Sequence, residues 1–535
     1  MKRISRRSAL LAAVLALVVA LPAVTVSAAD SGSNAPTFTR GAHTSLPYQR
    51  VLPSLLPNSR ENTTAVAQNA GTAAATIAMD IYTPGGLYVS SASVTYANVP
   101  VGGSRTFPQA SNTGLTAGFR GVGVISSDQP ISAVLVREIA SNTDGKSYSI
   151  HDAYAAGANT ISLPYIANAL NGTYNTRMAI ANTGTAVACV TVAYAFVPGN
   201  GAIPASGSAP YTDNGTGGSG CSSGYPIAVG GQLTLSPDGV DSSTLMPAQT
   251  RNALMAATVT SIGSPVTVAV DAYLSDGTKK LASYDGFVVG GAAQEIGTQL
   301  SIPLALKTPD GYYSQILLSN PNSTAANATI VYTDGTSHQS YTVALTVPAN
   351  GTANHSVYSD NVVPTGFVGA ATVTSTQPLA AVVFRSKMTN GGSFVDEDLY
   401  TAANGVPVGR GATTARFPLI VRRLGMSGSY YGQNTWVSVS PANGGSATLT
   451  ITSVADSATV PGTCSSAATY TTTVTISSPT IFYQNLDLNN GFGTAPTCFY
   501  GSMTITSSAP IIAVADSTND LYNGDLDGMY NALTP

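Results

Sequence analysis

The sequence predicts an all-β protein: four tandem β-sandwich repeats that follow an N-terminal signal peptide. The first observation is a 22-residue pattern that occurs four times, as in GFVGAATVTSTQPLAAVVFRSK from Gly366 to Lys387. The second is that apolar residues alternate with Ser and Thr over short runs, which is typical of strands with one buried face. The third is that these runs show no helical period.

The N-terminus has the charged, apolar and small-residue order of an export signal. Four cations precede an apolar run from Ala9 to Val26, and small residues follow through Ala29. We therefore assign residues 1–29 to a cleaved signal peptide and expect an extracytoplasmic protein, secreted or associated with the cell surface. An uncleaved anchor is the alternative, but 18 residues interrupted by Pro22 are marginal for a membrane span. SRRSALL from Ser5 also resembles a twin-arginine signal without its usual aromatic residue, which leaves the export route open.

The four copies of the pattern set the length of one repeat. Each copy is an alternating apolar run, a short polar break that ends in proline, and a second apolar run. The prolines are 135, 113 and 132 residues apart, at Pro130, Pro265, Pro378 and Pro510. The predicted sandwich repeats are residues 45–157, 158–290, 291–409 and 410–535.

The second repeat serves as the template for the strands. It opens on an edge-type strand, TISLPYI, because Pro164 cannot donate to a sheet ladder. Two apolar strands then flank the turn Asn182-Thr183-Gly184, where we predict a hairpin because these residues tolerate left-handed backbone angles. The same arrangement recurs around Asn69, Asn320 and Asn443. A variable middle follows, and a final hairpin with a turn at Ser275-Asp276-Gly277 closes the repeat.

About seven short strands per repeat, with turn residues every ~8–12 positions, indicate a sandwich with immunoglobulin-like topology. Short Gly and Ala links join the repeats, so we expect a rod or string of beads well over about 100 Å long. A carboxylate followed closely by an aromatic residue recurs near each repeat's end. We expect the aromatic ring to plug the sandwich or to pack on the next repeat. The four pairs are Asp152 and Tyr154, Asp285 and Phe287, Asp398 and Tyr400, and Asp527 and Tyr530.

Charge is scarce in this chain. Only 9% of the residues are Asp, Glu, Lys or Arg, against about 25% in ordinary soluble domains. Without the four signal cations, 18 basic and 26 acidic residues remain. This excludes the clustered Lys and Arg on which nucleic-acid binding depends. Disorder is excluded as well, because 44% hydrophobic residues in alternation can bury a core.

Four cysteines in an exported chain indicate two disulfides and allow three pairings. Cys189 and Cys221 fall in the second repeat, and Cys464 and Cys498 fall in the fourth. We therefore predict the pairs Cys189–Cys221 and Cys464–Cys498. The close spacing that a structural metal site would need does not occur.

Catalytic and cofactor motifs are not found in the sequence. The four histidines, His43, His151, His338 and His355, share no spacing, and no HExxH, GxSxG or SxxK pattern occurs. We expect no enzyme and no cofactor. Calcium is the exception, because Asp520, Asp525 and Asp527 lie together in NDLYNGDLDG and calcium takes several oxygen ligands. Ordinary turn formation by Asp and Asn is the alternative explanation.

Aromatic residues supply the candidate contacts with other molecules. Tyrosine rings are apolar but carry a hydroxyl group, which suits them to sugars and to protein surfaces. We expect Trp436 in the core rather than on a sugar-binding surface. Tyr312, Tyr313, Tyr430 and Tyr431, each just before a predicted strand, are the candidates for exposed contacts.

The NTG turn between apolar strands and the G-x-A-x-V-T strand near each repeat's end resemble the immunoglobulin-like or fibronectin-like repeats of bacterial exported and cell-surface proteins. The resemblance spans about residues 45–535 and implies a non-catalytic spacer or adhesion role, with no functional residue carried over. We predict a structural or interaction protein of the surface-layer, fibre, spacer or adhesion type. Its partners would be other surface proteins, copies of itself, or polysaccharide. The alternatives are a carbohydrate-binding array, which needs exposed coplanar aromatic rings, and a secreted hydrolase, which needs converging acidic or Ser and His side chains.

Overall fold

The computed structural model describes residues 43, 45–56, 61–140, 146–201, 210–239, 243–275, 280–308, 311–387, 400–425, 432–456, 468–477, 480–482, 498–519 and 524–533. The predicted signal peptide, residues 1–29, lies outside these residues. The described chain is nearly all β, as predicted, with only three short 3-10 helices. Within it, no helix has the length and apolarity to cross a membrane.

The strands form four consecutive groups, which we call units 1 to 4. Unit 1 contains β1 (Tyr48–Leu55), β2 (Glu61–Asn69), β3 (Ala75–Tyr82), η1 (Ser90–Ala92), β4 (Val94–Val99), β5 (Ser104–Pro108), β6 (Gly121–Ser127), β7 (Ile131–Ala140) and β8 (Lys146–Asp152). Unit 2 contains β9 (Thr160–Asn168), β10 (Tyr174–Asn182), β11 (Ala188–Gly201), β12 (Tyr211–Asp213), β13 (Tyr225–Ile227), β14 (Gln232–Ser236), β15 (Thr244–Leu245), η2 (Ala248–Thr250), β16 (Ala253–Ile262), β17 (Val266–Leu274), β18 (Leu281–Asp285) and β19 (Phe287–Val288).

Units 3 and 4 have the same strand order, but each has one long strand where units 1 and 2 have two. Unit 3 contains β20 (Gly297–Lys307), β21 (Tyr312–Ser319), β22 (Ala326–Asp334), β23 (Ser340–Val347), β24 (Thr352–Ser356), β25 (Phe367–Lys387), β26 (Tyr400–Asn404), β27 (Val406–Pro407) and η3 (Val408–Arg410). Unit 4 contains β28 (Ala412–Arg422), β29 (Gln433–Pro441), β30 (Ala447–Ala455), β31 (Thr469–Ile476), β32 (Thr480–Phe482), β33 (Phe499–Asn519) and β34 (Gly524–Asn531).

Every unit is a pair of sheets with the same strand pairing. In unit 2 the outer sheet has β16 between β9 and β11, and the inner sheet runs β14-β10-β17-β18. Units 1, 3 and 4 pair their corresponding strands in the same way. Apolar side chains such as Met178, Ile180, Val190 and Val259 fill the space between the two sheets.

The repeated pattern crosses from one sheet to the other at its proline. In unit 3 it is one continuous strand, β25, whose first half pairs with β20 and β22 and whose second half pairs with β21 and β26. Pro378 lies at the crossing. Proline has no N–H group to donate to a neighbouring strand, so it is tolerated where the chain leaves one sheet for the other. β33 does the same at Pro510, and β6–β7 and β16–β17 do so as two strands.

This crossing differs from the predicted immunoglobulin-like topology. In an immunoglobulin sandwich the last two strands lie in one sheet beside the third. Here β16 pairs with β11 and β9, whereas β17 pairs with β10 in the opposite sheet. Strand alternation is the same for both topologies, so the pattern of residues could not distinguish them.

The turns predicted as hairpins at Asn69, Asn182 and Asn320 are instead arches between the two sheets. β10 and β11 flank Asn182 but have no pairing with each other. The Asn182 side chain holds the arch, donating to the carbonyls of Ala186 and Ile227 at 2.8 and 2.9 Å and accepting from the Gly184 N–H at 2.9 Å. Asn69 and Asn320 make the same three bonds in units 1 and 3.

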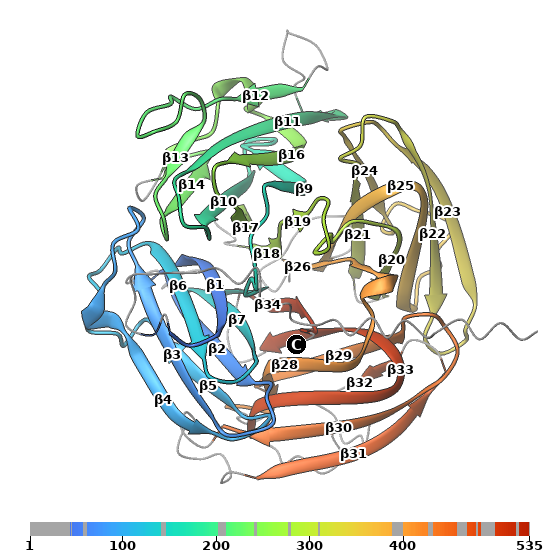
Figure 1. Ribbon diagram of the computed structural model, residues 1–535. Coiled ribbons are helices and arrows are strands. Elements are labelled where there is room, and N and C mark those ends of the chain that lie inside the picture. Colours follow the sequence, from blue (N-terminus) through green and yellow to red (C-terminus); the bar gives the residue numbers. More distant parts are fainter. Residues whose placement is uncertain are drawn as a thin grey trace, which may run out of the picture.

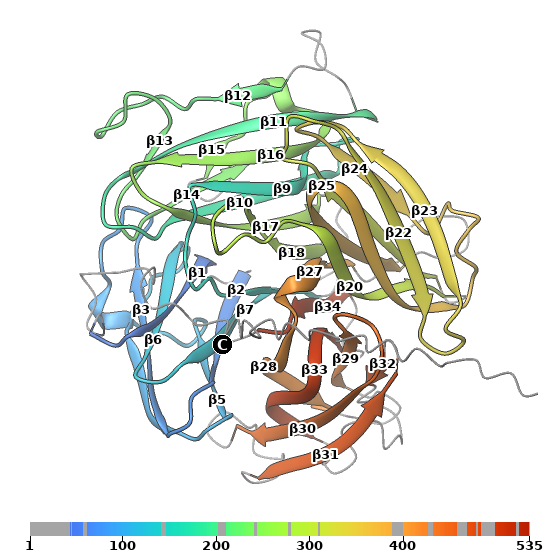
Figure 2. The same ribbon diagram turned by 45° about the vertical axis from the view of Figure 1, so that its right-hand side comes forward.

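The four units form a closed ring rather than the predicted rod (Figure 1). They follow one another around a common centre in both views (Figures 1 and 2). The ring closes where β34 of unit 4 pairs in parallel with β8 of unit 1, with Gly524 opposite Lys146 and Leu526 opposite Tyr148. Buried apolar clusters also continue from each unit into the next, so the short links fold the units together rather than spacing them out.

Candidate functional site

The centre of the ring is built from one strand near the end of each unit, namely β8, β18, β26 and β34, which contact one another. Each of these strands ends on a polar residue that pairs with the residue four positions after the repeat's proline. These equivalent residues are Asp152, Asp285, Asn404 and Asn531. The equivalence corrects the predicted carboxylate–aromatic pairs, because in units 3 and 4 the corresponding residues are asparagines rather than Asp398 and Asp527. Asp398 itself lies outside the described residues.

Hydrogen bonds join these four residues in sequence across the unit boundaries. The Asn531 amide donates to the Asn404 carbonyl at 3.0 Å, and the Asn404 amide donates to the Asp285 carbonyl at 2.8 Å. The Asp152 N–H donates to Asp285 Oδ2 at 3.1 Å. Burial, together with the neighbouring Asp285 carboxylate, raises the pKa of Asp152 well above its usual range. Burial likewise raises the pKa of Asp285, although His151 Nδ1, 3.6 Å from its Oδ1, favours the charged form.

Five of the chain's charged residues tie neighbouring units together inside the ring. Arg137 of unit 1 contacts Asp271 of unit 2, and Arg385 of unit 3 contacts Asp516 and Asp527 of unit 4. All five side chains are at most 4% exposed. The ties occur at the boundaries between units 1 and 2 and between units 3 and 4. Both arginines lie at the same position in the second half of the repeated pattern. The ties link neighbouring units through charges that solvent does not reach.

Glu61 extends the tie between units 1 and 2. Its Oε2 accepts from Arg137 at 2.7 Å and lies 3.6 Å from Arg177 of unit 2. Although burial disfavours the charged form, these guanidinium groups and Arg120 lower the pKa of Glu61 to about 2. The carboxylate is therefore ionised at any physiological pH.

A Thr–His–Asp chain lies on unit 1, and the sequence contained no signal for it. His43 Nδ1 is 3.0 Å from Asp80 Oδ1, and His43 Nε2 is 3.0 Å from Thr95 Oγ1. Asp80 is buried and also accepts from the His43 backbone N–H and the Ser93 hydroxyl, at 3.1 and 2.9 Å. The three residues are far apart in sequence, and only the pairing of β3 with β4 brings Asp80 near Thr95.

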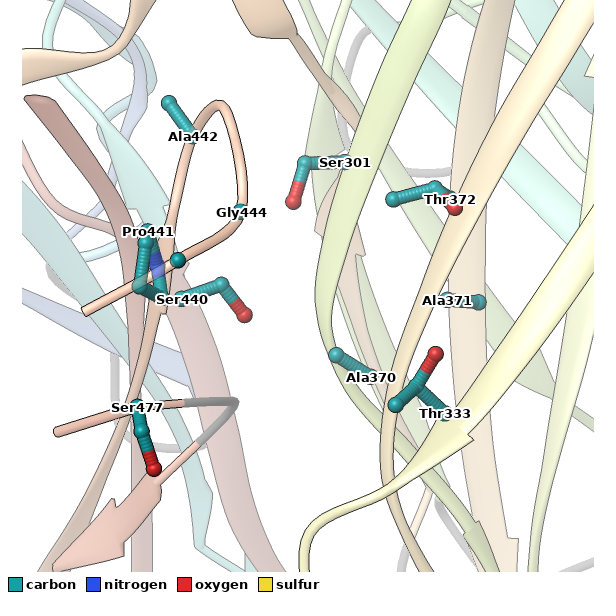
Figure 3. Close-up of a pocket in the computed structure, with 11 residues that line it drawn as sticks. Ser301, Thr333, Ala370, Ala371, Thr372, Ser440, Pro441, Ala442, Gly444 and Ser477 are labelled. Carbon is teal, nitrogen blue, oxygen red and sulfur yellow. The ribbon is translucent and has the colours of Figure 1, made fainter. Parts of the chain in front are cut away.

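A cleft of about 260 Å³ lies between units 3 and 4 (Figure 3). One wall is the outward face of β20, β22 and β25, and the other is the β29–β30 turn with Ser477. Among the described residues, its lining carries five hydroxyl groups, small apolar side chains and no charged or aromatic residue. Ser440 is 6% exposed, and its buried Oγ has no hydrogen-bond partner. Figure 3 shows Ser440 and Ser301 directing their hydroxyls into the gap from opposite walls.

The tyrosines predicted as exposed contacts do not form a described surface platform. Tyr313 is only 7% exposed and packs against Tyr358, with ring centroids 5.2 Å apart. Tyr312 is half-buried beneath Lys387, whose Nζ lies 5.1 Å from the ring centroid. Tyr430 and Tyr431 lie outside the described residues. Trp436 is half-buried, with the Arg385 guanidinium 6.0 Å from its ring centroid.

The predicted calcium ligands are not brought together as a described site. Asp527 is fully buried in the ion pair with Arg385. Asp520 lies outside the described residues, and the Asp525 side chain is outside them as well. Among the residues that can be described, no cluster of three His, Cys, Asp or Glu side chains could hold a metal ion.

The Cys189–Cys221 disulfide is confirmed, with Cα atoms 5.6 Å apart. It joins β11 to the loop before β13 in unit 2. Cys464 lies outside the described residues, so the pair Cys464–Cys498 stays a prediction.

No family model matches this chain, and no curated protein matches its sequence. Three solved structures show limited likeness. A Thermotoga maritima protein, described as Thermotoga maritima 1070, is 10% identical, with 20% of this chain and 92% of that chain covered, at a TM-score of 0.18. The Anabaena sensory rhodopsin transducer is 20% identical, with 16% of this chain and 90% of that chain covered, at a TM-score of 0.14. A tetra-tandem repeat in the extending region of a large adhesion protein is 14% identical, with 91% of this chain and 99% of that chain covered, at a TM-score of 0.11. Scores this low carry no argument about this protein's function.

Proposed function

We propose that this protein is an exported, non-catalytic interaction module at or near the cell surface. It associates through uncharged sheet edges with copies of itself or with other surface proteins. The observation that carries the proposal is the pair of edge strands β23 and β31. Each is eight residues long and contains no charged residue, and among the described strands each pairs on one side only.

Such edges favour association with another strand. An unblocked edge offers a row of N–H and C=O groups to another chain, and proteins that must stay apart protect their edges with Lys, Pro or bulges. β23 and β31 instead expose alternate small or hydroxyl-bearing residues along their whole length. On β31 these are Thr469, Thr471, Thr473 and Thr475.

The closed ring changes which structural role we favour. A spacer or fibre subunit depends on an extended shape. Four units arranged as a ring around a common centre are compact rather than extended (Figure 1). Adhesion or lateral assembly requires a rigid body with accessible edges, and the buried ties between units provide that rigidity.

The test measures association of the mature chain by sedimentation and electron microscopy, together with its binding to cell-envelope fragments of the producing organism. The edge variant Thr342→Lys/Thr473→Lys places a Lys on each edge strand. The control Asn327→Lys/Thr448→Lys places the same charges at exposed positions on the neighbouring strands β22 and β30. We expect the edge variant to lose association and the control to keep it. A wild-type chain that stays monomeric and binds no envelope fragment would contradict the proposal.

A secreted hydrolase is the second candidate, because the Thr95–His43–Asp80 chain has the spacing of a nucleophile, a base and an orienting carboxylate. The competing explanation is that Asp80 anchors His43, since it also accepts from the His43 backbone. Labelling by an electrophilic serine/threonine-hydrolase probe, lost in Thr95→Val, would support catalysis. An unlabelled wild-type chain would leave the anchoring role.

A further inference from the structure

We propose that the cleft between units 3 and 4 binds a neutral oligosaccharide. This inference goes beyond the proposed association through edge strands and does not depend on it. The walls come from different units, so the cleft exists only because the ring places β25 opposite the β29–β30 turn.

The lining defines the charge of the ligand. None of the lining residues that the structure describes can carry a charge, so an ionic ligand would lose its hydration there without gaining a partner. The described part of the lining also contains no aromatic residue, so it offers no stacking for a planar aromatic ligand. The cleft therefore selects neutral molecules that bind through hydrogen bonds and aliphatic contacts.

The hydroxyl groups define the hydrogen bonding of the ligand. Ser and Thr hydroxyls both donate and accept, as sugar hydroxyls do. The lining hydroxyls belong to Ser301, Thr333, Thr372, Ser440 and Ser477. Ser440 Oγ is buried without a partner, which costs free energy that a ligand hydroxyl in the cleft would recover. The methyl groups of Ala370 and Ala442 offer contacts to the C–H faces of a sugar ring.

The sheet geometry favours a saccharide over an extended peptide. A peptide that binds as an added strand needs a free sheet edge. Thr372 on β25 is paired with Ser301 of β20 on one side and with Val331 of β22 on the other. The backbone of this wall is thus already bonded within the sheet, and the wall presents side-chain hydroxyls.

The size of the cleft fits a short stretch of chain. About 260 Å³ is close to the lower end of the ~300–1,000 Å³ usual for small-molecule sites. Gly444 and Gly445 form the rim with positive φ, and a Cβ built on either would meet no atom within 4 Å. The rim is therefore open, and a longer saccharide can continue out of the cleft.

The experiment titrates the mature chain with neutral hexasaccharides of glucose, xylose, mannose and N-acetylglucosamine, followed by calorimetry and by amide NMR shifts of Gly444 and Gly445. The variants Ser440→Ala and Thr372→Val each remove one cleft hydroxyl. Thr374→Val is the matched control, because Thr374 is the next exposed residue on the same strand and lies outside the cleft. An oligogalacturonate of equal length tests charge selection.

We expect at least one neutral hexasaccharide to bind saturably and to shift the two glycine amides. Each cleft variant should weaken binding about fivefold, as for loss of one hydrogen bond, and the control should not. The proposal is overturned if no neutral hexasaccharide binds, if the cleft variants bind as the wild type does, or if the oligogalacturonate binds equally well. Edge-strand association is measured without sugar, so failure of one proposal is distinguishable from failure of the other.

Discussion

At the scale of single residues, charged groups of this protein act on one another across unit boundaries. The chain has few of them, and Arg137, Arg385 and their carboxylate partners are buried between units. A buried ion pair is not itself a large source of stability, but removing one partner leaves the other charge buried and unpaired. The ties therefore specify which faces of the units meet.

We expect Arg385→Leu to lower the free energy of unfolding by about 3–5 kcal/mol, because Asp516 and Asp527 would be left without their cation. The measurement is urea unfolding followed by circular dichroism. Arg410→Leu is the matched control: Arg410 is 43% exposed and 4.0 Å from Glu295, so its loss should cost less than about 1 kcal/mol. Equal effects of the two substitutions would show that the buried tie has no special role.

The central carboxylate of Asp152 makes stability depend on pH. Burial and the nearby Asp285 raise its pKa in the folded state, so its contribution is fully present below the unfolded pKa. That contribution is lost as the pH rises through the raised folded pKa. Asn404 and Asn531 occupy the equivalent positions in units 3 and 4, and their amides cannot ionise.

We therefore expect Asp152→Asn to raise the free energy of unfolding at pH 7 by about 1 kcal/mol or more, and to have less effect near pH 4. Unfolding in urea at a series of pH values measures the difference between variant and wild type. A difference that does not change with pH would show that the carboxylate does not titrate in this range.

At the scale of elements, the arch between the two sheets depends on one asparagine per unit. Asn182 is fully buried. Its side chain forms hydrogen bonds with three backbone groups that the arch would otherwise leave without partners. Pro441 stands at the corresponding end of β29 in unit 4, so that unit builds its arch without this side chain.

Asn182→Ala should destabilise the protein by about 2–3 kcal/mol, because it leaves buried carbonyl and N–H groups without partners. Asn327→Ala, at an exposed position on β22, is the control and should change stability by less than about 0.5 kcal/mol. Thermal or urea unfolding of both variants tests this. If the two asparagines prove equally replaceable, the side chain does not hold the arch.

At the scale of the whole molecule, the decisive feature is closure of the ring. Pairing of β34 with β8 joins the last strand of unit 4 to the last strand of unit 1, so that one sheet continues across that boundary. A compact chain of this length should have a radius of gyration of about 23 Å. We expect small-angle X-ray scattering of the mature chain to give a value near this, with a maximum dimension well below that of a rod. An extended scattering profile would exclude the ring.

By itself, the sequence determined the all-β class, the fourfold repetition of a proline-marked strand pattern and the Cys189–Cys221 pair, because alternation, turn residues and cysteine spacing are local properties. Only the tertiary structure decided that Asn182 forms an arch, that Arg385 meets Asp516, and that unit 4 returns to unit 1. Alternation says which side chains of a strand are buried but not which strand lies beside it, since the backbone groups that pair are the same at every residue. The cleft with Ser440 depends on how two units meet, so no single segment of the chain could have shown it.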